Sequence, residues 1–172
     1  MKTKKGSLFF LTIGTVLLVL LDQATKWAAS VYLKGSHPIA LVKGIFELYY
    51  LENRGSAFGL MQGKRFFFIV MALIVLIIIP YIYYQIPLSP RFVLLRLDAV
   101  LFLAGAVGNA IDRVVRGYVI DFLYFSLIDF PVFNVADIYV TVSAFTLFFL
   151  MLFYYKEEDL DQIHLLRSQK RI

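Results

Sequence analysis

The sequence predicts an α-helical integral membrane protein with four transmembrane helices. Of its 172 residues, 60% are hydrophobic and the mean hydropathy is +0.77, values that suit a polytopic membrane protein better than a soluble domain. Apolar runs predict spans over residues 7–27, 66–84, 92–112 and 135–155, of which the third is the weakest. Each approaches the roughly 20 residues that a helix needs to cross a hydrocarbon core about 30 Å thick. We expect one membrane-embedded domain, 1–172.

The first predicted span follows a short N-terminal stretch that carries three lysines. A basic start and an apolar run that ends near residues 28–30 (Ala-Ala-Ser) would also suit a cleaved signal peptide. Asp22, Gln23 and Lys26 interrupt the approach to any such cleavage site, however, and the apolar run is long. We therefore expect the first helix to be retained as a transmembrane span.

The outer segment 31–64, between the first two spans, is predicted to form a small extracytoplasmic β-sheet at the membrane surface. Residues Val42–Phe46 and Leu48–Leu51 are rich in β-branched, aromatic and other apolar residues. The Asn-Arg-Gly sequence at 53–55 is typical of a turn, and it follows the second of these runs.

The two remaining non-membrane segments are predicted to be helical. The second outer segment, 114–133, is partly apolar, and we expect a short interfacial helix in it that ends before Pro131. The tail, Lys156–Ile172, is charged and is predicted to extend the last transmembrane helix.

Basic residues predict that both termini lie in the cytoplasm. They occur before the first span, in the tail and, as Arg91 and Arg96, in the short connection between the second and third spans. The other side carries nearly as many, but in longer segments, which weigh less in the positive-inside rule.

Four aspartates gather at one edge of the predicted bundle: Asp22, Asp112, Asp121 and Asp137. Because the chain reverses direction at each crossing, the end of the first span, the end of the third and the start of the fourth lie on the same side. Asp22, Asp112 and Asp137 occupy those places, and Asp121 lies in the loop between the last two. A carboxylate near hydrocarbon costs at least ~2.5 kcal/mol, so a group of them predicts a functional site, here on the outer side.

The composition excludes several kinds of chemistry. The chain has no cysteine, which excludes disulfides, thiol catalysis and thiolate metal sites. Its two histidines, His37 and His164, fall on opposite sides of the predicted membrane, and no serine-hydrolase elbow, zinc-protease motif or Gly-rich phosphate loop is present. The net charge of +5 is not arranged in a basic stripe. We expect no metal, no cofactor and no nucleic-acid partner.

Two aspartates remain as a candidate acid–base pair. When two carboxyl groups are held close together they share a proton, so one acts as a base toward water and the other as an acid toward a substrate carbonyl. Asp121 and Asp137 fit best, because both have apolar neighbours and no cation beside them in the sequence. The alternative is that each caps a helix or faces water. Asp129 is expected to be an ordinary loop residue.

The other charged residues of this edge suggest structural ion pairs. Asn109, Asp112 and Arg113 share a helix face, so Arg113 is predicted to pair with Asp112 or another nearby carboxylate. Asp22 and Lys26, four residues apart, are predicted to pair in the same way, with direct participation of Asp22 in the chemistry as the alternative.

Five motifs, found in order along the chain, resemble those of the lipoprotein signal peptidases, the signal peptidase II family. They are Asp22–Lys26 (Asp-Gln-Ala-Thr-Lys), Asn53–Phe58 (Asn-Arg-Gly-Ser-Ala-Phe), Ala104–Arg113 (Ala-Gly-Ala-Val-Gly-Asn-Ala-Ile-Asp-Arg), Val119–Phe122 (Val-Ile-Asp-Phe) and Phe133–Asp137 (Phe-Asn-Val-Ala-Asp). Each motif alone is unspecific, whereas five in the right order and topology are highly specific.

The resemblance implies an aspartic endopeptidase of the bacterial cytoplasmic membrane, with its active site at the outer face. Its substrates would be prolipoproteins that carry diacylglycerol on a cysteine and lie partly in the membrane lipids. The enzyme would cut each substrate just before that cysteine. The resemblance implies that Asp121 and Asp137 are catalytic. The residues that it places around them are Asp22, Lys26, Asn53, Gly55, Asn109, Asp112, Arg113 and Asn134. We expect a monomer.

Two departures from the family pattern concern substrate fit rather than the reaction. Ala104 stands where many relatives have a glycine, and Ile138-Tyr139 follows the second aspartate where a small or hydroxyl residue is common. A proton- or cation-coupled transporter that uses the clustered aspartates is the alternative function, but only Asp98 lies toward the other edge. A non-catalytic assembly factor would leave so many polar residues at membrane depth unexplained.

Overall fold

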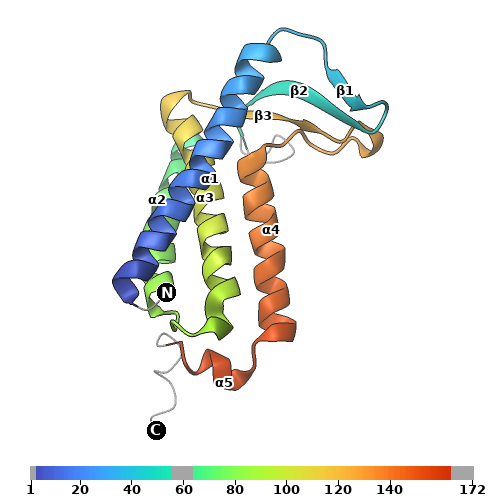
Figure 1. Cartoon of the computed structure of the whole chain (residues 1–172). Helices are drawn as coiled ribbons and strands as arrows, with labels where there is room; N and C mark the ends of the chain where they lie inside the picture. Colours follow the sequence, from blue (N-terminus) through green and yellow to red (C-terminus); the bar gives the residue numbers. More distant parts are fainter. Residues whose placement is uncertain (1–2, 56–63, 164–172) are drawn as a thin grey trace.

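The computed structural model describes residues 3–55 and 64–163, and in these ranges it contains four long helices and a small sheet (Figure 1). The long helices are α1 (Lys4–Tyr32), α2 (Arg65–Gln85), α3 (Val93–Val115) and α4 (Val135–Phe149). A 3₁₀ turn, η2 (Pro90–Phe92), precedes α3, and a π-helical turn, η4 (Leu150–Tyr154), continues α4. In the described part of the chain, these four segments are long and apolar enough to cross a membrane. The predicted fold class is confirmed.

Helix α3 lies at the centre of the bundle and packs against α1, α2 and α4. Two of its glycines allow neighbouring helices to approach closely. A Cβ atom added at Gly105 would lie 2.6 Å from the Ala136 carbonyl oxygen of α4, and one added at Gly108 would lie 2.5 Å from Oδ2 of Asp22 on α1. The glycines therefore fix α1 and α4 against the half of α3 that carries the polar side chains.

Three antiparallel strands form a sheet at one end of the bundle, in the order β1-β2-β3 (Figure 1). They are β1 (Ile39–Val42), β2 (Phe46–Asn53) and β3 (Val119–Tyr124). The predicted sheet in 31–64 is thus present. The run Val42–Phe46 is not one strand, however: Val42 ends β1, Phe46 begins β2, and residues 43–45 form the turn between them, where Gly44 adopts a φ of +72°.

The second outer segment differs from the prediction. Its first part is the strand β3, which pairs with β2, and the expected short helix is a single 3₁₀ turn, η3 (Ser126–Ile128). Strand β3 is rich in β-branched and aromatic residues. Its partner lies far earlier in the chain, so nothing in the local sequence distinguishes this strand from an apolar helix.

The tail does not extend α4 as predicted. Tyr155 is extended, with φ −86° and ψ 139°, and a separate short helix, α5 (Glu157–Leu160), follows. Arg91 holds this bend, because its guanidinium pairs with Asp159 at 2.9 Å and donates to the Tyr154 carbonyl oxygen. The last part of the predicted extension, 164–172, lies outside the described residues.

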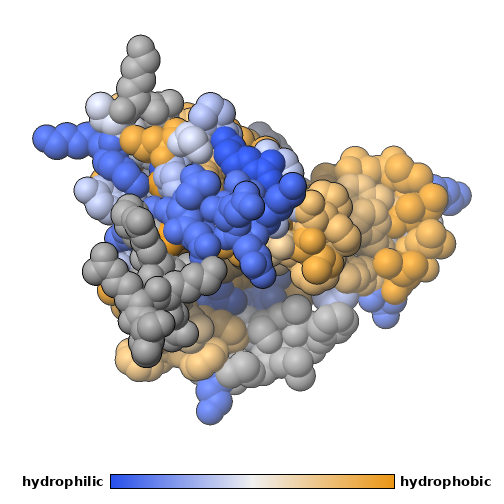
Figure 2. Space-filling view, turned by 90° about the horizontal axis from the view of Figure 1, so that it is seen from below, coloured by the Kyte–Doolittle hydropathy of each residue, from blue (hydrophilic) through white to orange (hydrophobic). Residues whose placement is uncertain are grey.

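The end of the bundle opposite the sheet has a polar closure of its own. The buried guanidinium of Arg96 donates to the carbonyl oxygens of Ile86 and Pro87, where α2 ends. Seen from this end, hydrophilic residues gather over the bundle and hydrophobic residues flank them (Figure 2). Helix α1 begins on this side of the bundle, and α5 lies here too (Figure 1). On the opposite side, next to the sheet, α1 and α3 end and α4 begins (Figure 1).

Candidate active site

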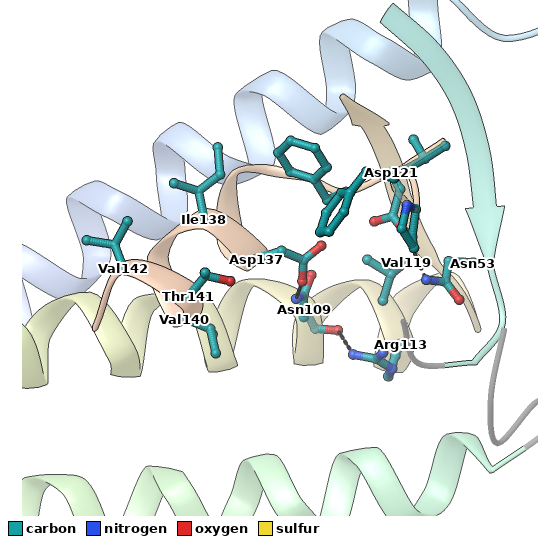
Figure 3. Close-up of a pocket in the computed structure, with 14 residues that line it drawn as sticks. Asn53, Asn109, Arg113, Val119, Asp121, Asp137, Ile138, Val140, Thr141 and Val142 are labelled. Atoms are coloured by element: carbon teal, nitrogen blue, oxygen red, sulfur yellow. Dashed lines mark hydrogen bonds between the residues drawn. The ribbon is translucent and has the colours of Figure 1, made fainter. Parts of the chain in front are cut away.

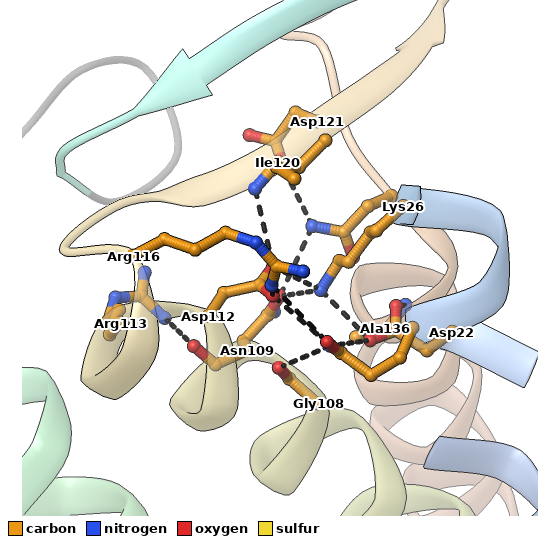
Figure 4. A network of polar contacts seen from close by, with 12 residues as sticks. Asp22, Lys26, Gly108, Asn109, Asp112, Arg113, Arg116, Ile120, Asp121 and Ala136 are labelled. Carbon is orange, nitrogen blue, oxygen red and sulfur yellow. Dashed lines mark hydrogen bonds and ion pairs between the residues drawn. The ribbon is translucent and has the colours of Figure 1, made fainter. Parts of the chain in front are cut away.

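A cluster of buried charges joins α1 to α3 next to the sheet (Figure 4). The Nζ atom of Lys26 lies 3.0 Å from Oδ2 of Asp22 and 3.0 Å from Oδ2 of Asp112, and all three side chains are 0% exposed. Arg116 pairs with the other oxygen of Asp112. Two carboxylates and two cations therefore balance one another. Charges that are buried away from water need such partners.

The two buried carboxylates also hold backbone groups beside the proposed catalytic residues. Asp22 accepts the N–H of Ala136 at 2.9 Å, and Asp112 accepts the N–H of Ile120 at 3.3 Å. Ala136 immediately precedes Asp137, and Ile120 immediately precedes Asp121. The charge cluster thus fixes the chain next to each of these two aspartates.

Arg113 does not pair with Asp112, which corrects the prediction from the sequence. Within the described ranges Arg113 forms no ion pair; its guanidinium donates to the Gly55 carbonyl oxygen at 3.1 Å and lies 4.5 Å from the ring centre of Phe68. Successive helix residues point about 100° apart, so when Asp112 faces Lys26 of α1, Arg113 is turned toward the cavity that holds Asp121 and Asp137. The cation that pairs with Asp112 from the same helix is Arg116, four residues later.

Asp121 and Asp137 come from different elements and are joined by asparagine side chains. Asp121 lies on β3, and Asp137 lies in the first turn of α4. Asp121 accepts hydrogen bonds from Nδ2 of Asn134 at 2.6 Å and from Nδ2 of Asn53 at 2.8 Å. Asp137 accepts from Nδ2 of Asn109 at 2.8 Å and from the backbone N–H of Asn134 at 3.1 Å. Each of the four carboxylate oxygens has one donor, and Asn134 bridges the pair.

The orientation of each asparagine amide is set by a second group that can only donate. A donor beside the side-chain oxygen forces the NH₂ group toward the aspartate. These contacts are Gly55 N with Asn53 Oδ1 at 2.9 Å, Lys26 Nζ with Asn109 Oδ1 at 2.9 Å, and Asp137 N with Asn134 Oδ1 at 3.0 Å. The last of them, with the reciprocal bond from Asn134 N, forms a capping box at the start of α4.

A cavity of about 500 Å³ opens beside the two aspartates (Figure 3). Its polar end holds Asp121, which is 1% exposed, and Asp137, which is only partly buried. Its other walls are mostly apolar and follow α4 and the chain before it: Val119, Phe130, Pro131, Val132, Phe133, Ile138, Val140, Thr141 and Val142. An apolar cavity with a few convergent polar groups is the usual form of a substrate site.

The electrostatic surroundings of Asp121 favour its protonated form. Burial, and after it the negative charge of Asp137, raises the pKa of Asp121 from 3.8 to about 7, although hydrogen bonds from Asn53 and Asn134 act in the opposite direction. Asp121 therefore holds a proton through much of the range below neutral pH. In the described part of the chain no three His, Cys, Asp or Glu side chains are grouped as metal ligands would be.

The structure brings all ten predicted site residues into one region, although Arg113 has a different partner. Of the Asn53–Phe58 motif, residues 56–58 lie outside the described residues. Sequence reasoning missed Arg116 and Gln23, which both contact Asp112. The four-residue spacing from Asp112 to Arg116 was a usable signal, whereas nothing in the sequence marks Gln23 apart from its place beside Asp22.

Comparisons with known proteins agree with this arrangement. A family model described as signal peptidase (SPase) II matches residues 14–153. The lipoprotein signal peptidase of Caldanaerobacter subterraneus subsp. tengcongensis is 45% identical over 139 residues, which cover 79% of this chain and 91% of that protein. The lipoprotein signal peptidase of Streptococcus thermophilus is 36% identical over 147 residues, covering 86% and 93%. These relatives do not support the transporter alternative.

Two solved structures share the fold. One bacterial membrane enzyme, determined at 2.3 Å, has a TM-score of 0.74 and 26% identity, and covers 94% of this chain and 93% of its own. A second, determined at 1.9 Å, has a TM-score of 0.72 and 28% identity, and covers 84% and 94%. With the family match and the curated relatives, they show that the chain belongs to the signal peptidase II family of multi-pass membrane peptidases.

Proposed function

We propose that this peptidase is an aspartic endopeptidase that removes the signal peptide from diacylglyceryl-modified prolipoproteins by cutting just before the lipidated cysteine. The observation that carries the proposal is the pair of carboxyl groups, Asp121 and Asp137, which share Asn134 as a donor at the polar end of an apolar cavity. The names of the relatives supply the substrate class.

The chemistry follows from the protonation of the pair. Asp121 is the less exposed of the two side chains, and we assign the shared proton to it. Asp137 is more open to the cavity and acts as the base: it removes a proton from a water molecule, which attacks the scissile carbonyl carbon. Asp121 gives its proton to the carbonyl oxygen. As the tetrahedral intermediate collapses, one of its hydroxyl groups returns a proton to Asp121, the C–N bond breaks, and the amine leaves with the proton from Asp137.

The charges of the site fit this mechanism. A pair of carboxyl groups with one proton carries one negative charge, and the single guanidinium of Arg113 faces it from α3. The neighbouring cluster of Asp22, Lys26, Asp112 and Arg116 is neutral as a whole. Arg113 is therefore free to offset the charge of the pair and of a developing oxyanion.

The cavity fits a substrate held partly in lipid. Ile138, Thr141 and Val142 extend its wall along α4 toward the membrane interior. Acyl chains in the lipid beside this wall would contribute binding energy at ~0.8 kcal/mol per buried CH₂ group, which explains a requirement for prior lipid modification.

We propose that the site faces the outer side of the bacterial cytoplasmic membrane, with both termini cytoplasmic and the protein monomeric. The chain has no cysteine, so single cysteines report position cleanly. Lys43→Cys in the β1–β2 connection is expected to react with an impermeant thiol reagent in intact cells, and Ser89→Cys in the α2–α3 connection only after lysis. The reverse pattern would overturn the orientation.

The cleavage assay uses purified protein in detergent with a lipid-modified precursor, and the unlipidated precursor as control. Asp121→Asn and Asp137→Asn are each expected to abolish release of the signal peptide and to remain folded, because asparagine is nearly isosteric but cannot exchange the proton. Asp129→Asn is the matched control and should cleave normally, because its carboxylate accepts a hydrogen bond from the Tyr124 hydroxyl on the exposed surface.

Two results would overturn the proposal. One is full activity in either the Asp121 or the Asp137 variant. The other is loss of wild-type activity on chelation that added metal restores, because a metal would then supply the activated water.

A further inference from the structure

Two residues that contact Asp112, Gln23 and Arg116, have no part in the chemical steps described above. We propose that they are positioning residues for the Asp121–Asp137 pair and act on it through Asp112. The inference rests on the proposed function, because the pair must be catalytic for its position and charge to control the rate.

Gln23 contacts both carboxylates of the cluster and is held in one orientation. Its Nε2 atom lies 3.1 Å from Oδ2 of Asp22, 3.2 Å from Oδ1 of Asp112 and 3.2 Å from the Gly108 carbonyl oxygen. Its Oε1 atom accepts from Arg116 at 3.3 Å. Since a guanidinium can only donate, the amide cannot reverse without losing all four contacts.

Arg116 supplies the second positive charge of the cluster. Its guanidinium bonds Oδ1 of Asp112, and its side chain is 29% exposed, whereas those of Asp22, Lys26 and Asp112 are 0% exposed. Without Arg116, two buried carboxylates would share one ammonium group, and the cluster would carry a net negative charge.

The effect reaches the catalytic pair through the two oxygens of Asp112. Oδ1 contacts Gln23 and Arg116, and Oδ2 contacts Lys26 and the N–H of Ile120, next to Asp121. Gln23 and Arg116 therefore hold the Asp112 carboxylate in place, and that carboxylate in turn holds the chain beside Asp121. Arg116 also adds a positive charge next to Asp112.

The charge effect predicts a change in the pH profile of cleavage. The charged groups that surround the pair are Asp22 and Lys26 from α1, and Asp112, Arg113 and Arg116 from α3. Glu52 on the neighbouring strand is paired with Lys34 at 2.8 Å instead. Removing the positive charge at 116 disfavours ionisation of the pair, so both limbs of the profile should move to higher pH, by about half a unit.

The experiment uses the absence of cysteine in the chain. Arg116→Cys is purified and divided in two, and the partly exposed position is labelled with aminoethyl methanethiosulfonate, which restores a cation, or with methyl methanethiosulfonate, which is neutral. Both samples derive from one folded preparation, so a purely structural loss affects them equally. Arg65→Cys, labelled in the same two ways, is the control, because Arg65 donates to the Val114 carbonyl oxygen at 2.8 Å and forms no ion pair in the described ranges.

For Arg116→Cys, the aminoethyl sample is expected to keep both limbs of the wild-type pH profile, and the methyl sample is expected to shift both limbs to higher pH. For Arg65→Cys, the pH profiles of the two samples should coincide. Identical limbs for both labels at position 116, or an equal shift at position 65, would overturn the role of Arg116. Asp121→Asn distinguishes failure of this inference from failure of the proposed function. If Asp121→Asn abolishes cleavage while the two labels at position 116 give the same pH profile, the proposed function stands and the positioning role of Arg116 is wrong.

Two further variants keep the inference testable if the cysteine variant does not fold. Arg116→Lys keeps the charge and should keep both limbs, so a shift in it would contradict the charge argument. Gln23→Met keeps Arg116 but removes the amide contacts, and it should lower the rate of cleavage without moving either limb. A wild-type rate in Gln23→Met would remove Gln23 from the proposal.

Discussion

Lys26 is the residue whose removal tests the architecture of the site most directly. Its ammonium group lies 3.0 Å from each of two carboxylates, Asp22 and Asp112, and none of the three side chains is exposed. Lys26→Met keeps the length and apolar stem of the side chain and removes only the charge. The cation that then remains in the cluster is Arg116, which pairs with Asp112, and Asp22 loses its ion pair.

The expected loss of unfolding free energy is about 3–5 kcal/mol, the usual result of removing one partner from a buried ion pair. A second effect should appear in the chemistry. Lys26 also donates to Oδ1 of Asn109 at 2.9 Å, and this bond orients the amide whose NH₂ group donates to Asp137. Without it the Asn109 oxygen keeps the longer bond from Nδ2 of Asn134 at 3.2 Å, so the amide is held less firmly and the rate should fall even where the protein remains folded.

The measurement combines thermal unfolding in detergent with cleavage of a lipid-modified precursor. Lys34→Met is the matched control, because Lys34 pairs with Glu52 at 2.8 Å but is 56% exposed, and pairs of that kind contribute at most about 1 kcal/mol. Adding Asp22→Asn to Lys26→Met restores the balance of charge and should recover part of the lost stability. If Lys26→Met melts like the wild type, or if Asp22→Asn makes it worse, the reasoning about the buried cluster is wrong.

Three further outcomes are expected. Because folding raises the pKa of Asp121 from 3.8 to about 7, the folded state alone holds that proton, and the wild type should lose up to about 4 kcal/mol of stability as the pH rises from about 4 to about 7. Asp121→Asn cannot titrate, so its Tm should rise relative to the wild type over that range, and a constant difference would contradict the assignment. Gly108→Ala places a Cβ 2.5 Å from Oδ2 of Asp22 and should lower stability by about 1–3 kcal/mol in a denaturation experiment. Arg113→Ala breaks no ion pair among the described residues but removes a contact to Gly55, so it should reduce the cleavage rate far more than the Tm. An equal loss in both would show that Arg113 has a structural role.

The part of the site that could be predicted from the sequence is the part that topology alone determines. Four spans are joined by three reversals of direction, which bring Asp22, Asp112 and Asp137 to one edge whatever the packing of the helices. The four-residue spacing of Asp22 and Lys26 likewise predicts their contact, because it depends only on the geometry of one helix.

The parts that could not be predicted depend on contacts between distant segments. Strand β3 exists because β2 lies beside it, and its sequence alone is equally typical of a partly apolar helix. The partner of Asp112 depends on which way α3 is rotated against α1, and this rotation turns Arg113 toward the cavity and leaves Arg116 for the ion pair. The bend after α4 depends on Arg91, which reaches it from another connection.

The buried cluster also explains why two aspartates from a strand and a helix can be held in register. The N–H before each of them is accepted by a carboxylate from another element: Ala136 by Asp22 of α1, and Ile120 by Asp112 of α3. Lys26 joins those two carboxylates, so the separation of the proposed catalytic pair depends on the α1–α3 contact as well as on the segment between β3 and α4, whose Asn134 bridges the pair. Buried ion pairs are often no more stabilising than well-packed apolar side chains of the same volume. A cluster of this kind is therefore better explained by the position that it imposes than by stability, and apolar substitutions that keep the fold while losing the cleavage are what this reasoning predicts.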